Sequence, residues 1–216
     1  MQSSYLVVDD FFQEPLKARE MVLGLTYPEP PPTVYYPGRN SRESLAWPGN
    51  ERMFSNILGE PVVGLNKQSH GRARLTLAAD ERRGRVHVDP GCTWAGIVYL
   101  TLDEHARGGT DFFRNLRYGT DRAPLTDEEA QRLYGKATPR EALTELLTVE
   151  GGSDMSQWER IFTLPMKFNR CILFRPWFWH SSGDGFGDTI ENGRLVLLLF
   201  FAPGPGAVNA AIVPPL

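Results

Sequence analysis

Residues 83–94, RGRVHVDPGCTW, place a histidine and an aspartate two positions apart in a stretch that is typical of a β-strand. Side chains two residues apart on a strand project to the same face, so His87 and Asp89 can direct an imidazole nitrogen and a carboxylate oxygen to one point. Such a pair also arises by chance, because acidic residues occupy 26 of the 216 positions. The alternatives are a satisfied core histidine and an aspartate that only caps the Asp-Pro-Gly turn.

A third candidate ligand, His180, ends the β-rich segment RCILFRPWFWH at residues 170–180. If this segment lies beside residues 84–89 in a jelly roll, His87, Asp89 and His180 meet at one mouth of the barrel. Two histidines and one carboxylate hold a metal on one face and leave its other positions open, which is the ligand set of non-haem Fe(II) oxygenases. A core or turn position is the alternative for His180.

Arg194 begins the apolar stretch RLVLLLFFA, after a turn rich in Gly, Asp and Asn. A guanidinium buried at the start of such a strand needs an anion, because an unpaired charge in the core is costly. A dicarboxylate co-substrate fits this need, since the planar fork of arginine matches a carboxylate. The alternative is a surface ion pair between Arg194 and Asp188 or Glu191.

The chain has 21 glycines and 17 prolines, which fits many turns between short strands. We expect a strand at residues 5–12, a helix at residues 14–25, an extended surface segment at residues 27–37 and a short helix at residues 52–58. The other β-prone segments predict a jelly roll or barrel of about seven or eight antiparallel strands. They are ARLTLAA (73–79), GRVHVD (84–89), TWAGIVYLTL (93–102), GTDFFR (109–114), RIFTLPMKF (160–168), RCILFRPWFWH (170–180) and RLVLLLFFA (194–202).

Residues 115–157 interrupt this pattern and predict inserted helices. TDEEAQRLYG opens on a capping box of Thr126 and Glu129, and TPREALTELL opens on one of Thr138 and Glu141. An insertion of this length between core strands can form a lid over a site or a surface excursion without a role. A homodimer through this insertion or through an exposed edge strand is compatible with the sequence.

The charge of the chain argues against a nucleic-acid or membrane partner. The formal net charge is −3, the pI is near 5.8 and the basic residues are scattered. The longest apolar run, residues 195–202, is far shorter than the roughly 20 residues that span a bilayer. The N-terminus reaches Asp9 and Asp10 without a secretory pattern, so we expect a cytoplasmic protein. Cys92 and Cys171 are then free thiols, with a nucleophilic Cys92 as the alternative.

These motifs resemble the Fe(II)/2-oxoglutarate-dependent oxygenase superfamily, in particular its small, prolyl-hydroxylase-like members. The family pattern of His-x-Asp, a distal histidine and an arginine on the following strand matches HVD at residues 87–89, His180 and Arg194. Several further segments resemble core elements of these proteins. They are YLVVDDFFQEPLKARE (5–20), WAGIVYLT (94–101), GGTDFF (108–113) and FNRCILF (168–174).

The resemblance implies a fold and a set of site residues. The fold is a mainly β double-stranded β-helix, a cupin-like jelly roll, with an N-terminal helix and a helical insertion at about 115–157, in one oxygenase-like domain over residues 1–216. Fe(II) is held by His87, Asp89 and His180. Arg194 binds the distal carboxylate of 2-oxoglutarate, and Tyr99 resembles a tyrosine that contacts the same carboxylate in many members.

The implied activity uses Fe(II), 2-oxoglutarate and O2 to hydroxylate a small molecule, an amino acid or a peptidyl side chain, with release of succinate and CO2. The carboxylate of Asp89 favours hydroxylation, desaturation or cyclisation over halogenation, because halogenating relatives have a small residue in its place. Two other hypotheses are a metal-dependent cupin-type enzyme that does not use 2-oxoglutarate and a non-catalytic jelly-roll binding module.

The remaining histidines, aromatic residues and arginines have simpler interpretations. His70 and His105 lack a partner at ligand spacing, which favours a structural role. Residues 177–179, WFW, are expected to pack in an aromatic core or to line a cavity. Arg170 and Arg175 are interpreted as solvated charges at a strand edge, with attraction of an anionic substrate as the alternative.

Overall fold

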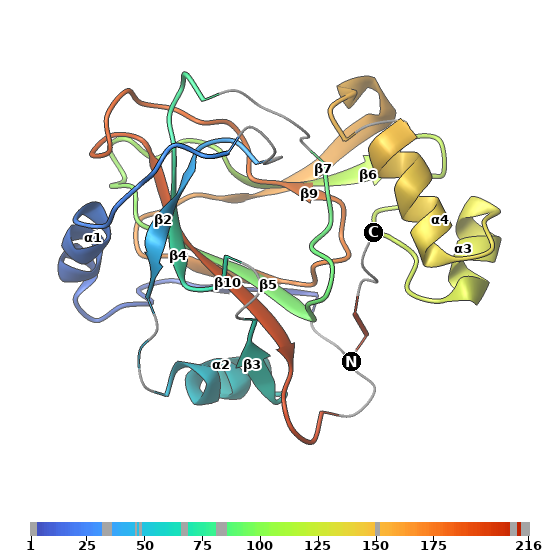
Figure 1. The fold of residues 1–216 in the computed structure, drawn as a ribbon, viewed down its shortest axis with the longest axis horizontal. Helices are drawn as coiled ribbons and strands as arrows, with labels where there is room; N and C mark the ends of the chain where they lie inside the picture. The colour runs from blue at the N-terminus through green and yellow to red at the C-terminus, as the bar shows by residue number, and fades with distance from the viewer. Residues whose placement is uncertain are drawn as a thin grey trace.

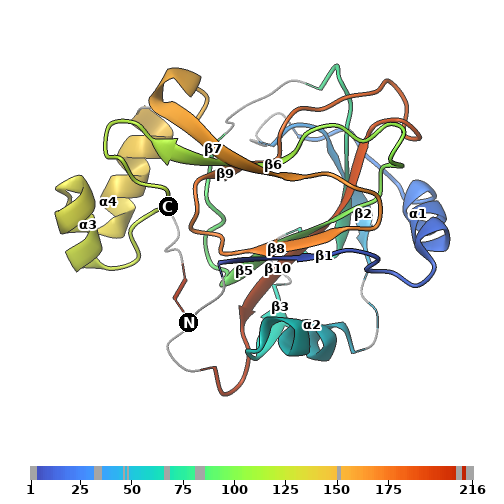
Figure 2. The ribbon, with the colours of Figure 1, turned by 180° about the vertical axis from the view of Figure 1, so that it is seen from behind.

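Two antiparallel β-sheets lie one above the other, as Figure 2 shows most directly (Figures 1 and 2). This computed structural model describes residues 4–31, 36–45, 47, 49–65, 69–80, 86–149, 152–207 and 211–212. The larger sheet has the order β1 (Tyr5–Val8), β8 (Cys171–Phe174), β5 (Trp94–Tyr99), β10 (Arg194–Pro203), β4 (Arg72–Thr76) and β2 (Arg39–Ser44), and β3 (Val62–Gly64) also pairs with β10. The smaller sheet has the order β7 (Trp158–Pro165), β6 (Gly109–Asn115) and β9 (His180–Ser181).

Two short helices cover the outer face of the larger sheet. α1 (Pro15–Leu23) begins with a proline in its first turn, where a missing backbone N–H is tolerated, and it buries Val22. α2 (Asn50–Leu58) ends at Gly59, whose left-handed conformation suits a glycine, and it buries Phe54. Both buried side chains belong to the core cluster between these helices and the sheet.

β10 crosses the middle of the larger sheet and is buried on both faces. Leu195 and Leu197 pack into the core cluster under the helices. Val196 and Leu198 point to the opposite face, where they pack with Phe112 of the smaller sheet. This double burial explains why the segment is an unbroken apolar run instead of an alternating one.

The insertion lies between β6 and β7 and is helical, as predicted. It contains α3 (Asp127–Tyr134), α4 (Pro139–Thr144), a π-helical turn η1 (Glu145–Val149) and a 3-10 turn η2 (Met155–Gln157). The hydroxyls of Thr126 and Thr138 accept hydrogen bonds from the backbone N–H groups of Glu129 and Glu141, which confirms both threonine caps. The carboxylates of these glutamates accept from the N–H groups of the residues just before the caps, Leu125 and Ala137. In Figure 1 these helices form a unit beside the edge of the smaller sheet.

Several element boundaries differ from the sequence prediction. Of the strand predicted at residues 84–89, residues 84 and 85 lie outside the described part of the chain. Residues 86–89 form a single bridge at His87 instead of a regular strand, because the chain turns at once through Pro90. Residues 170–180 are not one strand: β8 ends at Phe174, Pro176 interrupts the backbone, and His180 lies in β9 of the other sheet.

Two strands and one turn were also missed by the sequence interpretation. β2, RNSRES, has no apolar alternation, and β3 has only three residues. The first strand ends at Val8, before Asp10 adopts a left-handed conformation with φ of 54°. Residues 27–31 lack regular structure, as expected for the proline-rich segment, and residues 32–35 lie outside the described part of the chain. No helix within the described residues is long and apolar enough to cross a membrane.

Phe54 joins three segments of the core, so its truncation tests the packing of α2. Its ring lies 4.7 Å from the ring of Phe201, 5.8 Å from that of Phe11 and 6.2 Å from that of Trp47, and it is fully buried. We predict that Phe54→Ala lowers the free energy of unfolding by about 3–5 kcal/mol in guanidinium denaturation.

Leu16→Ala is the matched control, because Leu16 is 65% exposed on α1 and its truncation is expected to change stability by less than about 0.5 kcal/mol. Equal effects of the two substitutions would contradict the packing described for α2.

Candidate metal centre

A pair of backbone hydrogen bonds positions the two histidines. The N–H of His87 donates to the carbonyl of His180 at 2.9 Å, and the N–H of His180 donates back to His87 at 3.0 Å. Two residues further on, the N–H of Asp89 donates to the carbonyl of Pro176 at 3.1 Å. Segments far apart in the sequence are thereby held side by side, with the carboxylate on the same side as both imidazoles.

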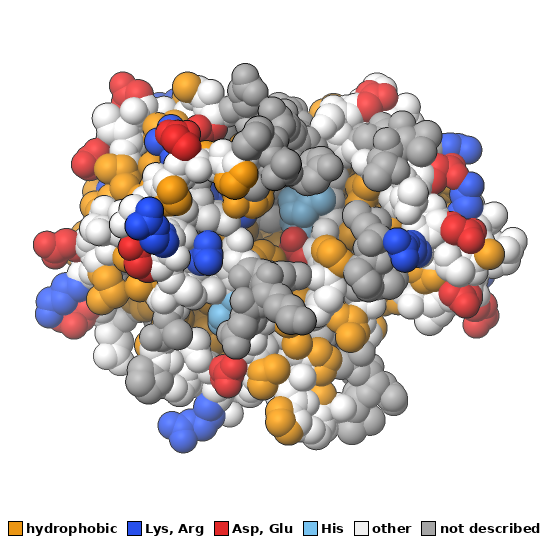
Figure 3. Space-filling model, viewed as in Figure 1, with side chains coloured by type: hydrophobic (Ala, Val, Ile, Leu, Met, Phe, Trp, Pro, Cys, Tyr) orange, Lys and Arg blue, Asp and Glu red, His pale blue; other side chains and the backbone are white. Residues whose placement is uncertain are grey.

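His87, Asp89 and His180 converge as the sequence spacing suggested. Each offers one ligand atom, and these atoms all lie within 4.8 Å of one another. The Nε2 atom of His180 lies 3.1 Å from Oδ2 of Asp89, and Nε2 of His87 lies 3.8 Å from Oδ1. Nδ1 of His180 is 2.8 Å from the carbonyl oxygen of Phe178, which orients the ring so that Nε2 faces the cluster. In the space-filling view of Figure 3, an exposed histidine side chain (pale blue) lies next to an acidic side chain (red) near the middle of the face shown.

The carboxylate of Asp89 stays ionised in this setting. Burial raises the pKa of Asp89, but the charge and hydrogen bond of His180, the charge of His87 and the charge of Arg74 outweigh burial and hold the pKa below its ordinary value. A carboxylate oxygen and two imidazole nitrogens are a suitable donor set for a divalent transition metal. The residues present therefore fit such an ion.

Arg194 is buried in the same region with an unpaired nitrogen. Its side chain is fully buried, and its Nη2 atom has no hydrogen-bond partner. Burial lowers the pKa of Arg194, while nearby Tyr99 and Asp111 raise it, and a guanidinium remains charged at neutral pH. Within the described residues it forms no ion pair with Asp188 or Glu191, which removes the surface alternative. A buried donor without an acceptor fits an anionic ligand.

Tyr99 lies near Arg194 but does not line the cavity, because Thr110 lies between its hydroxyl and the cavity. The ring of Tyr99 is 6.0 Å from the guanidinium carbon of Arg194, and its hydroxyl is 2.8 Å from Oγ1 of Thr110. Burial raises the pKa of Tyr99 to about 12, so the phenol is protonated at neutral pH. Thr110 lines the cavity and Tyr99 does not. The sequence interpretation missed Thr110, although it lies in the quoted GGTDFF motif.

A cavity of about 550 Å³ connects the candidate ligands to Arg194. Its walls come from both sheets and from the insertion, whose Leu147 and Gly152 contribute to the lining. The insertion is therefore more than a surface excursion. The lining residues are Tyr36, Pro37, Arg74, Val86, His87, Val88, Asp89, Pro90, Ala95, Gly96, Ile97, Thr110, Leu147, Gly152, Phe174, His180, Ser181, Ser182, Gly183, Arg194, Leu198 and Phe200.

Arg74 of β4 is a second cationic residue in this cavity that the sequence interpretation did not single out. It is paired in register with Val196 of β10, and Arg194 is paired with Thr76. Because Arg74 and Thr76 are two residues apart on one strand, they share a face with Arg194. The alternation of polar and apolar residues in ARLTLAA already placed Arg74 and Thr76 on one face of a strand. Assigning that face to the cavity required knowledge that this strand lies beside β10.

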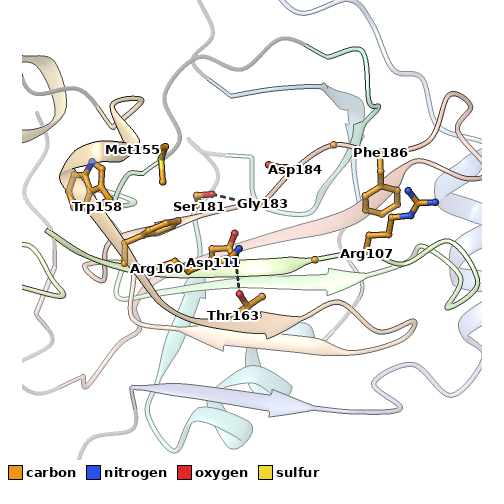
Figure 4. A pocket seen from close by; sticks show the side chains of 13 residues that line it. Arg107, Asp111, Met155, Trp158, Arg160, Thr163, Ser181, Gly183, Asp184 and Phe186 are labelled. Atoms are coloured by element: carbon orange, nitrogen blue, oxygen red, sulfur yellow. Dashed lines mark hydrogen bonds and ion pairs between the residues drawn. The ribbon is translucent and has the colours of Figure 1, made fainter. Parts of the chain in front are cut away.

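A second hollow, of about 600 Å³, lies on the outer face of the smaller sheet (Figure 4). Asp111 projects into it and accepts a hydrogen bond from the Thr163 hydroxyl at 2.5 Å, with Nη1 of Arg160 at 3.8 Å. Asp111 is paired in register with Ser181, and it lines this hollow but not the cavity that holds the candidate ligands. The carboxylate of Asp111 is thus engaged outside the cavity that holds the candidate ligands.

The other histidines and aromatic residues have structural positions. His70 is half-buried and accepts a hydrogen bond from the backbone of Phe200, and His105 lies 3.4 Å from Glu104 at the surface. Both lie outside the ligand cluster. Trp177 and Trp179 pack in the core cluster beneath the insertion, so the aromatic-core interpretation of residues 177–179 holds for them.

The interpretation of Arg175 as a solvated charge was wrong. Arg175 is 4% exposed, forms an ion pair of 2.8 Å with Glu60, and stacks 4.0 Å above the ring of Trp94. Arg170 pairs with Asp9 at 2.6 Å at the surface, and its hydrogen bond lowers the pKa of Asp9 to about 2. Neither arginine lines the cavity.

Comparison with known proteins supports the fold. Residues 1–201 match a family of unknown function, DUF6445. No curated protein matches the sequence. The structure is similar to that of HygX from Streptomyces hygroscopicus with nickel, 2-oxoglutarate and hygromycin B bound, with a TM-score of 0.50 and 14% identity over 99% of this chain and 93% of HygX.

Two other solved structures show weaker similarity. EctD from S. alaskensis with bound Fe has a TM-score of 0.45 and 16% identity over 99% of this chain and 76% of EctD. The non-heme alpha ketoglutarate dependent carbocyclase SnoK from nogalamycin biosynthesis has a TM-score of 0.45 and 14% identity over 100% of this chain and 90% of SnoK. The likeness to HygX, together with the two antiparallel sheets, confirms the predicted jelly-roll fold.

Both cysteines are inaccessible, which removes Cys92 as a nucleophile. Each has a fully buried side chain. Burial raises the pKa of both thiols, and the charge of Asp89 raises that of Cys92 further.

We predict that iodoacetamide labels neither thiol in the native protein at neutral pH and labels both after denaturation, as measured by mass spectrometry. Ser156→Cys, at an exposed position, is the positive control. Rapid labelling of Cys92 in the native protein would restore the nucleophile hypothesis.

Proposed function

For this chain, which belongs to DUF6445, a family of unknown function, we propose an Fe(II)- and 2-oxoglutarate-dependent oxygenase activity. The observation that carries the proposal is the convergence of His87, Asp89 and His180 at one end of a cavity that also contains the unpaired guanidinium of Arg194. The fold shared with HygX, whose structure contains nickel and 2-oxoglutarate, supports the general class. We also propose that residues 1–216 act as a single domain of this kind, because HygX aligns over 99% of the chain.

His87, Asp89 and His180 are the proposed Fe(II) ligands. Asp89 supplies an anionic oxygen, and the two histidines supply neutral nitrogens. The carbonyl of Phe178 holds the Nδ1 proton of His180, which leaves Nε2 as the ligand atom. A metal held by these three residues would keep its other coordination positions open to the cavity.

Arg194 is the proposed partner of the distal carboxylate of 2-oxoglutarate. Its Nη2 atom lacks an acceptor, and a carboxylate satisfies it with a charge-assisted hydrogen bond. Thr110 lines the same part of the cavity, and its hydroxyl is oriented by Tyr99. Tyr99 therefore acts on the co-substrate through Thr110 in this proposal.

When bound, Fe(II) and 2-oxoglutarate supply the activation of O2: one oxygen atom enters succinate as CO2 is released, and the other enters a C–H bond of the substrate. The protein holds the metal and the co-substrate in place and keeps water away from them. Phe174, Leu198 and Phe200 present apolar surface to the cavity and exclude water from it. Asp89 occupies the ligand position that a halide needs, which favours hydroxylation over halogenation.

A small molecule or a peptidyl side chain is the proposed substrate. The cavity of about 550 Å³ is within the range of sites for small ligands. The structure of HygX contains hygromycin B, which supports a small molecule.

The metal ligands are tested by substitution. We predict that Asp89→Ala and His180→Ala lower the affinity for Fe(II) by more than about 100-fold, since loss of a group that only orients a ligand already costs about 10- to 100-fold. Anaerobic Fe(II) titration measures the affinity. The wild type, supplied with Fe(II), 2-oxoglutarate and O2, is expected to form succinate slowly without added substrate, and both variants are expected to lose this activity.

His105→Ala is the matched control, because His105 lies at the surface outside the cluster. Succinate formation at the wild-type rate by Asp89→Ala and His180→Ala would contradict the proposed function. The absence of Fe(II) binding by the wild type would instead favour the binding-module hypothesis.

Arg194 separates this proposal from a cupin-type enzyme that does not use 2-oxoglutarate. We predict that Arg194→Met raises the dissociation constant of 2-oxoglutarate by about 100-fold, because one partner of a buried charged pair is lost. The affinity for Fe(II) is expected to stay within about threefold, since Arg194 is not a metal ligand in this proposal. Unchanged 2-oxoglutarate affinity, with an intact far-UV circular dichroism spectrum, would favour the cupin-type alternative.

A further inference from the structure

Arg74 presents a second guanidinium to the cavity that the proposed Fe(II) and 2-oxoglutarate sites do not use. It lies on β4 and lines the cavity together with Asp89 and Arg194. Its Nε–H donates to Oδ1 of Asn40 at 2.7 Å, and no carboxylate within the described residues forms an ion pair with it. As far as the described residues are concerned, the two terminal nitrogens of Arg74 are therefore available to a ligand.

Tyr36 and Asn40 hold this guanidinium in place. The guanidinium carbon of Arg74 lies 3.9 Å from the centre of the Tyr36 ring, a stacked arrangement that fixes the plane of the group. Nδ2 of Asn40 donates to the hydroxyl of Tyr36 at 3.1 Å and to Oγ of Ser69 at 2.8 Å. Such an ordered guanidinium loses little conformational freedom when it binds an anion.

The charged groups around the cavity leave a net positive charge once the metal and the co-substrate are bound. The two positive charges of Fe(II) and the two negative charges of 2-oxoglutarate cancel one another. Arg74 and Arg194 then carry two positive charges against the single carboxylate of Asp89, while Asp111 is engaged on the outer face with Thr163. Among the described lining residues, one positive charge remains. An unpaired charge in a partly dry cavity is unfavourable, so a bound monoanion stabilises the complex.

We propose that the substrate carries a carboxylate and that Arg74, supported by Tyr36 and Asn40, binds it through its two terminal nitrogens. This inference rests on the proposed oxygenase function and names the chemical class of its substrate, a small-molecule carboxylic acid. Arg74 is then a binding residue for the substrate, whereas Arg194 binds the co-substrate. Arg74 and Arg194 lie on one face of neighbouring strands, and each binds one of the two anions, the substrate and 2-oxoglutarate respectively.

Acetate, the smallest carboxylate, and acetamide, its uncharged counterpart, serve as probes. The protein is loaded with Mn(II), which replaces Fe(II) and relaxes nearby protons, and with 2-oxoglutarate. Relaxation of the methyl protons of each probe is then measured by NMR. Because the effect requires proximity to the metal, binding in the cavity is distinguished from binding elsewhere on the surface.

We expect acetate to show a saturable relaxation enhancement at least about tenfold larger than acetamide, since only acetate pairs with a guanidinium. Arg74→Gln is expected to remove at least about nine-tenths of the acetate effect and to leave the dissociation constant of 2-oxoglutarate within about threefold. Arg74→Lys, which retains the charge but loses the planar fork, is expected to retain part of the effect. Arg72→Gln, an exposed arginine on the same strand, is the matched control and is expected to behave as the wild type.

Three results would overturn this inference while leaving the proposed function intact. Equal effects of acetate and acetamide on the wild type would remove the need for a carboxylate. A full acetate effect in folded Arg74→Gln protein would place the anion elsewhere, for example on the metal. A loss of 2-oxoglutarate affinity in Arg74→Gln as large as that in Arg194→Met would assign Arg74 to the co-substrate. If the wild type binds neither Mn(II) nor 2-oxoglutarate, the proposed function fails, and this inference fails with it.

Discussion

The reciprocal backbone hydrogen bonds between His87 and His180 are the contact on which the site depends. Within the described chain they form the only β-bridge of residues 86–89, yet they set the register of the two segments that carry the ligands. Because side chains of a hydrogen-bonded pair lie on the same side of the two strands, the imidazole rings lie next to each other, with centres 4.3 Å apart. The carbonyl of Pro176 then fixes Asp89 two residues further on.

The larger sheet makes a separate contribution, because its register sets the position of both cationic groups. Arg194 of β10 lines the cavity. β4 pairs with β10 in antiparallel register and presents Arg74 to the cavity from the same face of the sheet. Burial and the positive charge of Arg194 lower the pKa of Arg74 to about 10, although Tyr36 and Asp89 act in the opposite direction. The fold keeps both charged at neutral pH without an ion pair for Arg74 among the described residues. Unfavourable charge in the free protein is typical of a site that binds anions.

The sequence predicted the parts of the site that depend on local spacing. His87 and Asp89 share a face because they are two residues apart, and the order of the strands was available from a family resemblance. Contacts between distant segments were not predictable in this way. The pairing of Arg175 with Glu60 gives no local signal, and Arg74 required knowledge that β4 lies beside β10. β2 was missed because its stability comes from pairing with β4 and not from an apolar pattern of its own.

The insertion belongs to the scaffold of the metal site, because the residues that alternate with the ligands pack against it. Val86 and Val88 flank His87, and Trp179 precedes His180; all three belong to the core cluster beneath the inserted helices. The N–H of Val86 also donates to the carbonyl of Gly152 at 2.9 Å, and a Cβ at Gly152 would overlap the carbonyl oxygen of Val86. The segment that carries His87 is thus held between the cavity on one side and the core of the insertion on the other. A change in the packing of the insertion is therefore transmitted to the ligands through residues adjacent to them in sequence, even though no residue between Asn115 and Trp158 is itself a proposed ligand.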